Sequence, residues 1–125
     1  MAGEKTVLIV DDSVTVRDLL STVLKGKSFS VLEAGSGSDA LKKLNGHRAD
    51  IVITDIDMPD MNGIDLIKNL RKKEGCENIP VIVLSSLSPR LAGVEEKELD
   101  VVEWIEKPFS PRYLLSVIER IQNSL

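Results

Sequence analysis

The stretch Ile51-Val52-Ile53-Thr54-Asp55 places a carboxylate directly after an apolar run that has the length of a short strand. The same arrangement occurs where Val7-Leu8-Ile9-Val10 precedes the acidic pair Asp11-Asp12. Apolar runs of this kind are typical of strands that are buried on both faces of a parallel sheet. A carboxylate at the end of such a strand is held at the rim of the sheet, where it can meet a ligand.

Two further strand-like runs end in groups that complement these carboxylates. Val81-Ile82-Val83-Leu84 precedes the hydroxyl group of Ser85, and Trp104-Ile105-Glu106 precedes the ammonium group of Lys107. If the strands are parallel and adjacent, their carboxyl ends meet at one edge of the sheet. The sequence therefore predicts a functional site made of carboxylates, a hydroxyl group and a cation.

The composition indicates an ordinary soluble domain. The chain has 125 residues, which suits one domain with one core. Hydrophobic residues make up 42% and charged residues 29%, and no apolar run approaches the roughly 20 residues that cross a bilayer. The net charge of −4 argues against direct nucleic-acid binding. The first residues lack the layout of a signal peptide, and Cys76 is the single cysteine, so we expect a cytoplasmic protein with a surface thiol.

Strand and helix patterns alternate from end to end. The predicted strands are Thr6–Val10, Phe29–Glu33, Ile51–Thr54, Val81–Leu84 and Val101–Glu106. The first predicted helix begins after Ser13 as its cap and ends at Gly26. The other predicted helices are Asp39–Leu44, Ile64–Lys73, Leu91–Leu99 and a last amphipathic segment from Leu114 to Leu125.

This alternation predicts an α/β fold, a doubly wound five-stranded parallel sheet with five helices on its two faces. The second and fifth strands contain polar residues such as Ser30 and Glu103, as edge strands do, whereas the other three are continuously apolar. The order 2-1-3-4-5, the flavodoxin-like order, satisfies both observations. Ligands of such sheets bind at the switch point between the first and third strands, where Asp11, Asp12 and Asp55 would lie.

The chemistry of these residue types favours a hard cation and a phosphoryl group. Each pair of carboxylates about 4–5 Å apart repels by roughly 3–4 kcal/mol at an effective dielectric constant near 20. Oxygen ligands without histidine or cysteine favour Mg²⁺, with Mn²⁺ possible. An aspartate beside such a metal can attack phosphorus and form an aspartyl phosphate. Lys107 would neutralise the phosphoryl oxygens, and Ser85 would donate a hydrogen bond to them.

At these residues the chain resembles the receiver domain of bacterial two-component response regulators, especially the single-domain chemotaxis type. The motifs are Asp11-Asp12, Asp55 with Met58-Pro59 and Asn62-Gly63 after it, Ser85, and Lys107-Pro108-Phe109. The resemblance covers residues 5–123, so we expect residues 1–125 to form a single receiver domain.

The resemblance implies that Asp55 accepts a phosphoryl group from a histidine kinase or a phosphotransfer protein. Magnesium would be ligated by the carboxylates of Asp12 and Asp55 and by the backbone carbonyl of Asp57, with Asp11 acting through a metal-bound water. Lys107 would pair with the phosphoryl group, and its bond to Pro108 would be cis. The only catalysis expected is the protein's own phosphorylation and dephosphorylation.

In the family, a hydroxyl group moves toward the phosphoryl group while an aromatic side chain on the fifth strand turns inward. Ser85 and Trp104 match these positions, although plain edge-strand packing is the alternative for Trp104. Leu87 stands two residues beyond the hydroxyl, where the family tunes attack by water, and its apolar side chain predicts slow self-dephosphorylation. Asp100 replaces the glycine that commonly ends the fourth helix, which predicts a different helix end there.

The resemblance further implies an unknown downstream protein that binds the face of the fourth helix, fifth strand and last helix. A monomer is expected, with phosphorylation-dependent dimerisation as a possibility. A receiver excised from a larger response regulator or hybrid kinase is an alternative. A small phosphatase of the haloacid-dehalogenase type is a weaker one, because Asp55-Ile56-Asp57 matches its nucleophile motif but leaves Asp11-Asp12 without a role.

Overall fold

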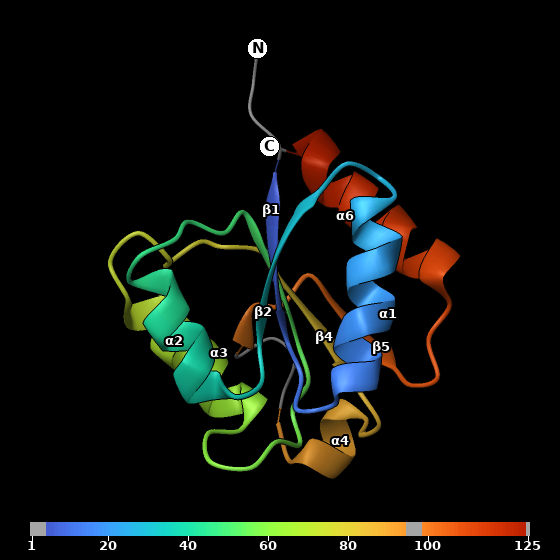
Figure 1. Ribbon diagram of the computed structural model, residues 1–125. Helices are drawn as coiled ribbons and strands as arrows, with labels where there is room; N and C mark the ends of the chain where they lie inside the picture. Colours follow the sequence, from blue (N-terminus) through green and yellow to red (C-terminus); the bar gives the residue numbers. More distant parts are fainter. Residues whose placement is uncertain (1–4, 95–98, 125) are drawn as a thin grey trace.

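The computed structural model describes residues 5–94 and 99–124. The described strands are β1 (Thr6–Val10), β2 (Ser30–Ala34), β3 (Ile51–Thr54), β4 (Val81–Ser85) and β5 (Glu103–Glu106). The described helices are α1 (Val14–Lys25), α2 (Gly37–Leu44), α3 (Gly63–Lys72), α4 (Pro89–Ala92) and α6 (Pro111–Ser124) (Figure 1). Strands and helices alternate along the chain, as the sequence predicts.

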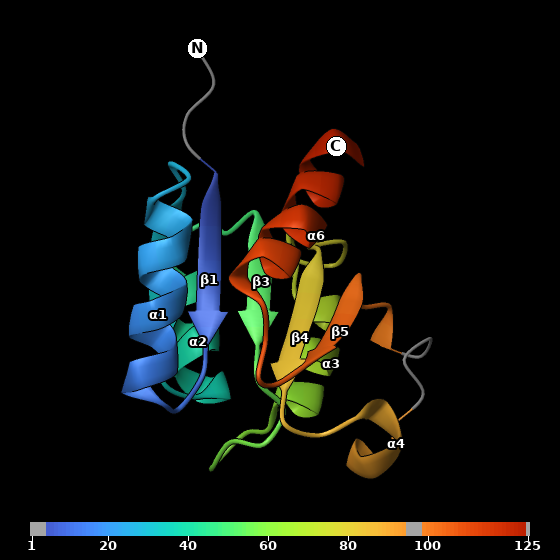
Figure 2. The same ribbon diagram turned by 90° about the vertical axis from the view of Figure 1, so that its right-hand side faces the viewer.

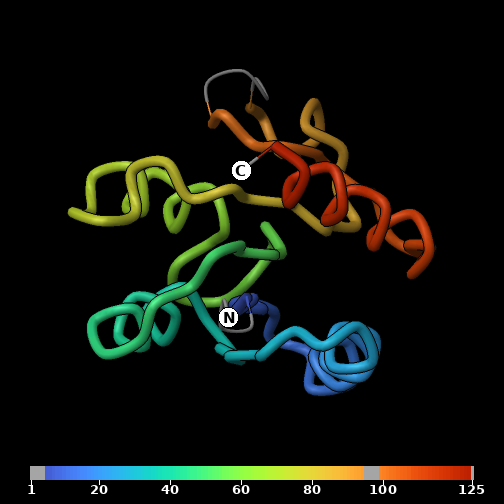
Figure 3. Tube along the Cα trace, turned by 90° about the horizontal axis from the view of Figure 1, so that it is seen from above, coloured from blue at the N-terminus to red at the C-terminus, as the bar shows by residue number. Residues whose placement is uncertain are grey.

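The five strands form one parallel sheet in the order β2-β1-β3-β4-β5, which confirms the predicted topology. Helices α1 and α6 cover one face, and α2 and α3 cover the other (Figures 1 and 3). Alternate residues of the central strands feed two separate cores, so that Val7 and Ile9 pack toward α1 and α6 while Leu8 and Val10 pack toward α2 and α3. The arrows of β1, β3, β4 and β5 point to one end of the molecule, the end at which α4 lies (Figure 2), and β2 runs parallel to β1.

Local sequence signals set the helix boundaries. The Ser13 side chain accepts a hydrogen bond from the Val16 amide at 3.3 Å and caps α1, as predicted. Gly26 ends α1 in right-handed geometry. Among the described residues, no helix combines the length and the apolar character that crossing a membrane requires.

The structure corrects the prediction for Cys76 and describes the backbone at Asp100. Cys76 is buried rather than exposed, because the turn that joins α3 to β4 folds it against the α2–α3 core. Asp100 does adopt left-handed geometry, with φ of 52°, so the turn keeps the backbone conformation that a glycine would supply. Arg71 fixes this turn, since its Nη2 donates to the Asp100 carbonyl at 2.9 Å.

The segment predicted as the helix Leu91–Leu99 differs at its start. Helix α4 begins earlier, at Pro89 after the cap Ser88, and ends at Gly93 in left-handed geometry with φ of 75°. Proline in the first turn and glycine after the last turn are strong helix-boundary signals. Residues 95–98 of the predicted helix lie outside the described residues.

Candidate functional site

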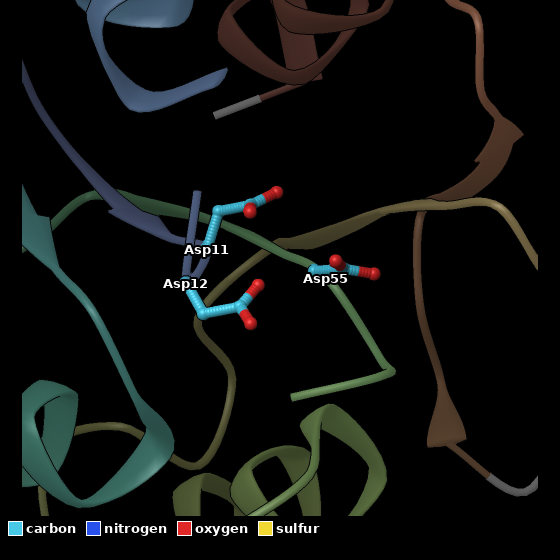
Figure 4. Close-up of side chains that lie close together, drawn as sticks. All are labelled: Asp11, Asp12 and Asp55. Carbon is cyan, nitrogen blue, oxygen red and sulfur yellow. The ribbon is translucent and has the colours of Figure 1, made fainter. Parts of the chain in front are cut away.

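Three carboxylates meet where β1 and β3 end. One ligand atom from each of Asp11, Asp12 and Asp55 lies within 4.8 Å of the others. Figure 4 shows the three side chains close together. Asp11 is only 2% exposed and Asp55 is 8% exposed, whereas Asp12 is exposed. The predicted convergence at the switch point is therefore confirmed for these three side chains.

Asp55 is held rigidly by its own backbone and by its neighbours. Its amide donates to the Val10 carbonyl at 2.9 Å, which ties the end of β3 to the end of β1. Its Oδ1 accepts a hydrogen bond from the Ile56 amide at 2.7 Å. The start of α3 approaches closely, since a Cβ added at Gly63 would lie 2.0 Å from the Asp55 carbonyl oxygen. Only glycine permits this approach, which gives the Asn62-Gly63 motif a structural cause.

Lys107 joins the two buried carboxylates. Its Nζ lies 2.9 Å from Asp11 Oδ2 and 3.3 Å from Asp55 Oδ2. Burial alone would lower the pKa of Lys107, but the hydrogen bond to Asp11 and the charges of Asp55 and Asp11 outweigh it, so the pKa is raised. Lys107 is thus a cation at neutral pH and offsets part of the carboxylate repulsion. The Lys107–Pro108 bond is cis, as predicted.

Asp11 and Asp12 follow each other in the chain but are held differently. Asp11 Oδ1 accepts a hydrogen bond from the Ser13 amide at 2.9 Å, so this carboxylate also supports the start of α1. Across residues 5–94 and 99–124, no side chain or amide forms a hydrogen bond or ion pair with the Asp12 carboxylate. Asp12 is therefore open to an added ligand.

The hydroxyl group and the aromatic side chain of the predicted switch are linked through Leu87. Ser85 is fully buried, and its Oγ accepts a hydrogen bond from the Leu87 amide at 3.1 Å. Trp104 is half-buried, and its Nε1 donates to the Leu87 carbonyl oxygen at 2.7 Å. One peptide segment thus connects the two residues, although they lie on different strands.

Two further polar residues, Asp57 and His47, lie in loops. Asp57 is exposed in the β3–α3 loop, two residues beyond Asp55. The use of its backbone carbonyl as a ligand stays a prediction. His47 is exposed between α2 and β3, at the opposite end of the strands from the acidic cluster.

The donor set fits a hard divalent cation. Three carboxylates supply oxygen ligands, two of them buried, and neither histidine nor cysteine belongs to the cluster. Magnesium and manganese prefer such ligands and retain open positions for water or phosphate oxygens. A bound cation would also relieve repulsion that the single charge of Lys107 leaves uncompensated.

Sequence reasoning missed Arg17 and Glu33, which lie behind this cluster. Arg17 is on α1 and donates to the Asp11 carbonyl oxygen at 2.7 Å, while Glu33 on β2 accepts from its Nε at 3.3 Å. Glu33 ends the predicted strand Phe29–Glu33, where a polar residue indicates no more than an edge strand. The only signal in the sequence is that Arg17 lies near the start of the helix predicted after the acidic pair, and this position alone does not mark a function.

An open parallel α/β sheet with an acidic switch point and a lysine from the neighbouring loop defines a class of small regulatory domains. The sequence matches the response regulator receiver domain over residues 7–119. The chain therefore belongs to the response regulator receiver domain family, as the resemblance indicated.

Individual relatives agree with this assignment. The chain is 34% identical over 116 residues to the chemotaxis protein CheY of Pseudomonas aeruginosa, covering 92% of this chain and 94% of the relative. The solved structure of the chemotaxis response regulator CheY4 of Vibrio cholerae has a TM-score of 0.85 at 33% identity, covering 94% of this chain and 98% of the other. The response regulator TrrA of Thermotoga maritima, solved in complex with Mg²⁺-BeF, has a TM-score of 0.81 at 28% identity, covering 93% and 97%.

Other relatives are longer than this chain. The chain spans 47%, 48% and 24% of the length of three curated relatives, which are described as transcriptional regulators. The matched part therefore corresponds to a receiver domain that occurs both nearly alone and within larger proteins.

Proposed function

We propose that this protein is a phosphorylation-activated signalling switch in which Asp55 accepts a phosphoryl group in a Mg²⁺-dependent reaction. The observation that carries the proposal is the grouping of Asp11, Asp12 and Asp55 within 4.8 Å, with Lys107 Nζ on Asp55 Oδ2. Receiver domains act with histidine kinases and downstream effectors, so the phosphodonor is a phosphohistidine of a sensor kinase or of a phosphotransfer protein.

In the transfer step, a carboxylate oxygen of Asp55 forms a bond to phosphorus while the phosphorus–nitrogen bond of the donor breaks and the imidazole leaves. Lys107 supplies a cation beside the attacking carboxylate. After the transfer, its ammonium group would pair with the negatively charged phosphoryl oxygens. Asp12, Asp55 and the Asp57 carbonyl would hold Mg²⁺, Asp11 acting through water; the bound ion would neutralise phosphoryl oxygens. The complex of TrrA with Mg²⁺-BeF supports this ligand class.

The signal would pass through Ser85. A phosphoryl group on Asp55 offers acceptor oxygens to the Ser85 hydroxyl, and turning toward them would weaken its bond to the Leu87 amide. Since the Leu87 carbonyl holds Trp104 Nε1, the aromatic ring would respond. This link favours the switch interpretation of Trp104 over plain packing.

The output surface would be the face formed by α4, β5 and α6. Three apolar side chains on these elements or next to them in the chain are exposed, namely Leu91 at 73%, Val102 at 42% and Tyr113 at 45%. A downstream protein that binds this face could sense a movement of Trp104. In this proposal the protein is a cytoplasmic monomer, a single domain over residues 1–125, and phosphorylation can promote dimerisation.

The proposal is tested by incubating the protein with a small acyl phosphate and Mg²⁺ and measuring its intact mass. We expect one added phosphoryl group per chain, a change in Trp104 fluorescence, and loss of both in Asp55→Asn or with a chelator. An unchanged mass in the wild-type protein would refute the proposal. Steady turnover of a phosphoester would instead favour the phosphatase alternative.

A further inference from the structure

Arg17 is bonded to the backbone of the acidic cluster rather than to its carboxylates. Its Nη1 donates to the Asp11 carbonyl oxygen at 2.7 Å, and its Nε donates to Glu33 Oε1 at 3.3 Å. The Arg17 side chain is only 18% exposed. The guanidinium group therefore bridges α1, the end of β1 and the edge strand β2 from one largely buried position.

The carbonyl that Arg17 holds belongs to the peptide unit between Asp11 and Asp12. A peptide unit is planar and contains the nitrogen and Cα of the next residue. Holding the Asp11 carbonyl oxygen therefore also restrains the backbone from which the Asp12 side chain projects. The Asp11 amide is fixed as well, since it donates to the Ala34 carbonyl at 3.1 Å. The Asp12 carboxylate has no hydrogen-bonding or ionic partner of its own among the described residues, so its direction depends on this backbone.

Arg17 is itself anchored from two sides. Glu33 lies opposite Ile9 in the β1–β2 ladder, so its carboxylate has a fixed origin. A Cβ added at Gly35 would lie 3.4 Å from Arg17 Nη1, which shows that the guanidinium packs against the chain just after β2. A planar group with two directed bonds and a packed face can set an orientation that a flexible ammonium group cannot.

We propose that Arg17, anchored by Glu33, is a positioning residue that orients Asp12 for metal binding. This inference rests on the proposed Mg²⁺ site and adds a residue to it. The charge of Arg17 and its positioning of Asp12 would have opposite effects on the affinity for Mg²⁺. A positive charge near the cluster repels a divalent cation, so a purely electrostatic role means that removing Arg17 tightens Mg²⁺ binding. A positioning role means that removing Arg17 weakens it.

The test measures the Mg²⁺ dissociation constant of Arg17→Gln and Arg17→Lys by calorimetric titration of the folded proteins. Arg17→Lys keeps the charge and loses the two-pronged geometry. We expect both variants to bind Mg²⁺ about tenfold more weakly, the lower end of the range for losses of groups that orient metal ligands. The matched control is Arg48→Gln, because the Arg48 side chain is 90% exposed and pairs only loosely with Asp50 at 3.7 Å.

Amide NMR spectra of the metal-free variants are to be recorded first, and only variants with the spectrum of a folded protein are titrated, so that global unfolding does not enter the dissociation constants. Equal or tighter binding by Arg17→Gln, or unchanged binding by Arg17→Lys, would overturn the inference while leaving the proposed function intact. A wild-type protein that binds no Mg²⁺ would overturn both.

Discussion

Lys107 carries the charge balance of the site at the residue scale. With Lys107→Gln, Asp11 and Asp55 lose their shared cation, and we expect the free energy of unfolding at pH 7 to fall by about 1–3 kcal/mol. Because folding raises the pKa of Lys107, the contribution is fully present below the unfolded value, near 10.4, and is lost as pH rises through the folded value. Urea unfolding of both proteins in a chelator between pH 7 and 11 measures it. A difference that grows above pH 10 would contradict this assignment.

Leu87 controls what surrounds a water molecule beside the proposed phosphoryl group. Its amide bonds to Ser85 and its carbonyl to Trp104, so a substitution of its half-buried side chain leaves both of these backbone groups in the chain. An apolar side chain offers no hydrogen bond to orient water for attack on phosphorus. We expect Leu87→Asn to speed loss of the phosphoryl group several-fold, followed by intact mass after removal of the donor. Leu87→Met is the control, and an equal or slower decay in Leu87→Asn would refute the idea.

At the element scale, Arg71 on α3 forms hydrogen bonds with the segments that precede β4 and β5. Its Nη1 donates to the Ile79 carbonyl at 2.7 Å ahead of β4, and its Nη2 donates to the Asp100 carbonyl ahead of β5. Hydrogen bonds from a charged donor contribute about 1.5–3 kcal/mol. We expect Arg71→Gln to lower the free energy of unfolding by about that amount in chemical denaturation. A loss no larger than that of exposed Arg48→Gln would show that these hydrogen bonds are unimportant.

The same contact shows where sequence reasoning reaches its limit. Strands β1 and β3 begin and end where the apolar runs predict, because their burial leaves a local signature. The turn at Asp100 is set instead by Arg71, which is 29 residues away in the chain. Cys76 is buried by tertiary packing despite polar neighbours that indicate an exposed loop. Local patterns record neither effect, since both depend on groups that only the folded sheet brings together.

The acidic cluster, unlike the turn at Asp100, was predictable from the sequence, because it follows from the order of the strands. Parallel strand ends share one edge, so a carboxylate after β1 and another after β3 must come together once the strand order is known. Arg17 was missed because its partners are a backbone carbonyl and an edge-strand glutamate, neither of which marks a helix residue as functional in the sequence. Ligand positions followed from topology, whereas the group that orients them did not.

At the scale of the whole molecule, repulsion among the carboxylates of the site destabilises the metal-free folded protein, and a bound cation would remove this destabilisation. The exposed carboxylate of Asp12 lies beside buried Asp11 and Asp55, and Lys107 supplies only one compensating charge. Asp12→Asn removes one negative charge and little packing, so we expect the metal-free variant to be more stable than the metal-free wild type. Because Asp12 is exposed, the dielectric constant of water applies, and the expected gain in the free energy of unfolding is about 1 kcal/mol. Chemical denaturation in a chelator measures this difference.

Magnesium should reverse that ranking, because an ion that binds only the folded state stabilises it through mass action. At a Mg²⁺ concentration one hundred times the dissociation constant, the wild-type protein should gain about 2.7 kcal/mol. Asp12→Asn loses a ligand and should gain little stability from Mg²⁺. The wild-type protein should therefore become the more stable of the two as Mg²⁺ is added. Asp39→Asn is a suitable control for a general charge effect, since Asp39 pairs with Lys43 on α2 rather than with the cluster. If Mg²⁺ stabilises wild type and Asp12→Asn equally, the Asp12 carboxylate is not a ligand of the cation.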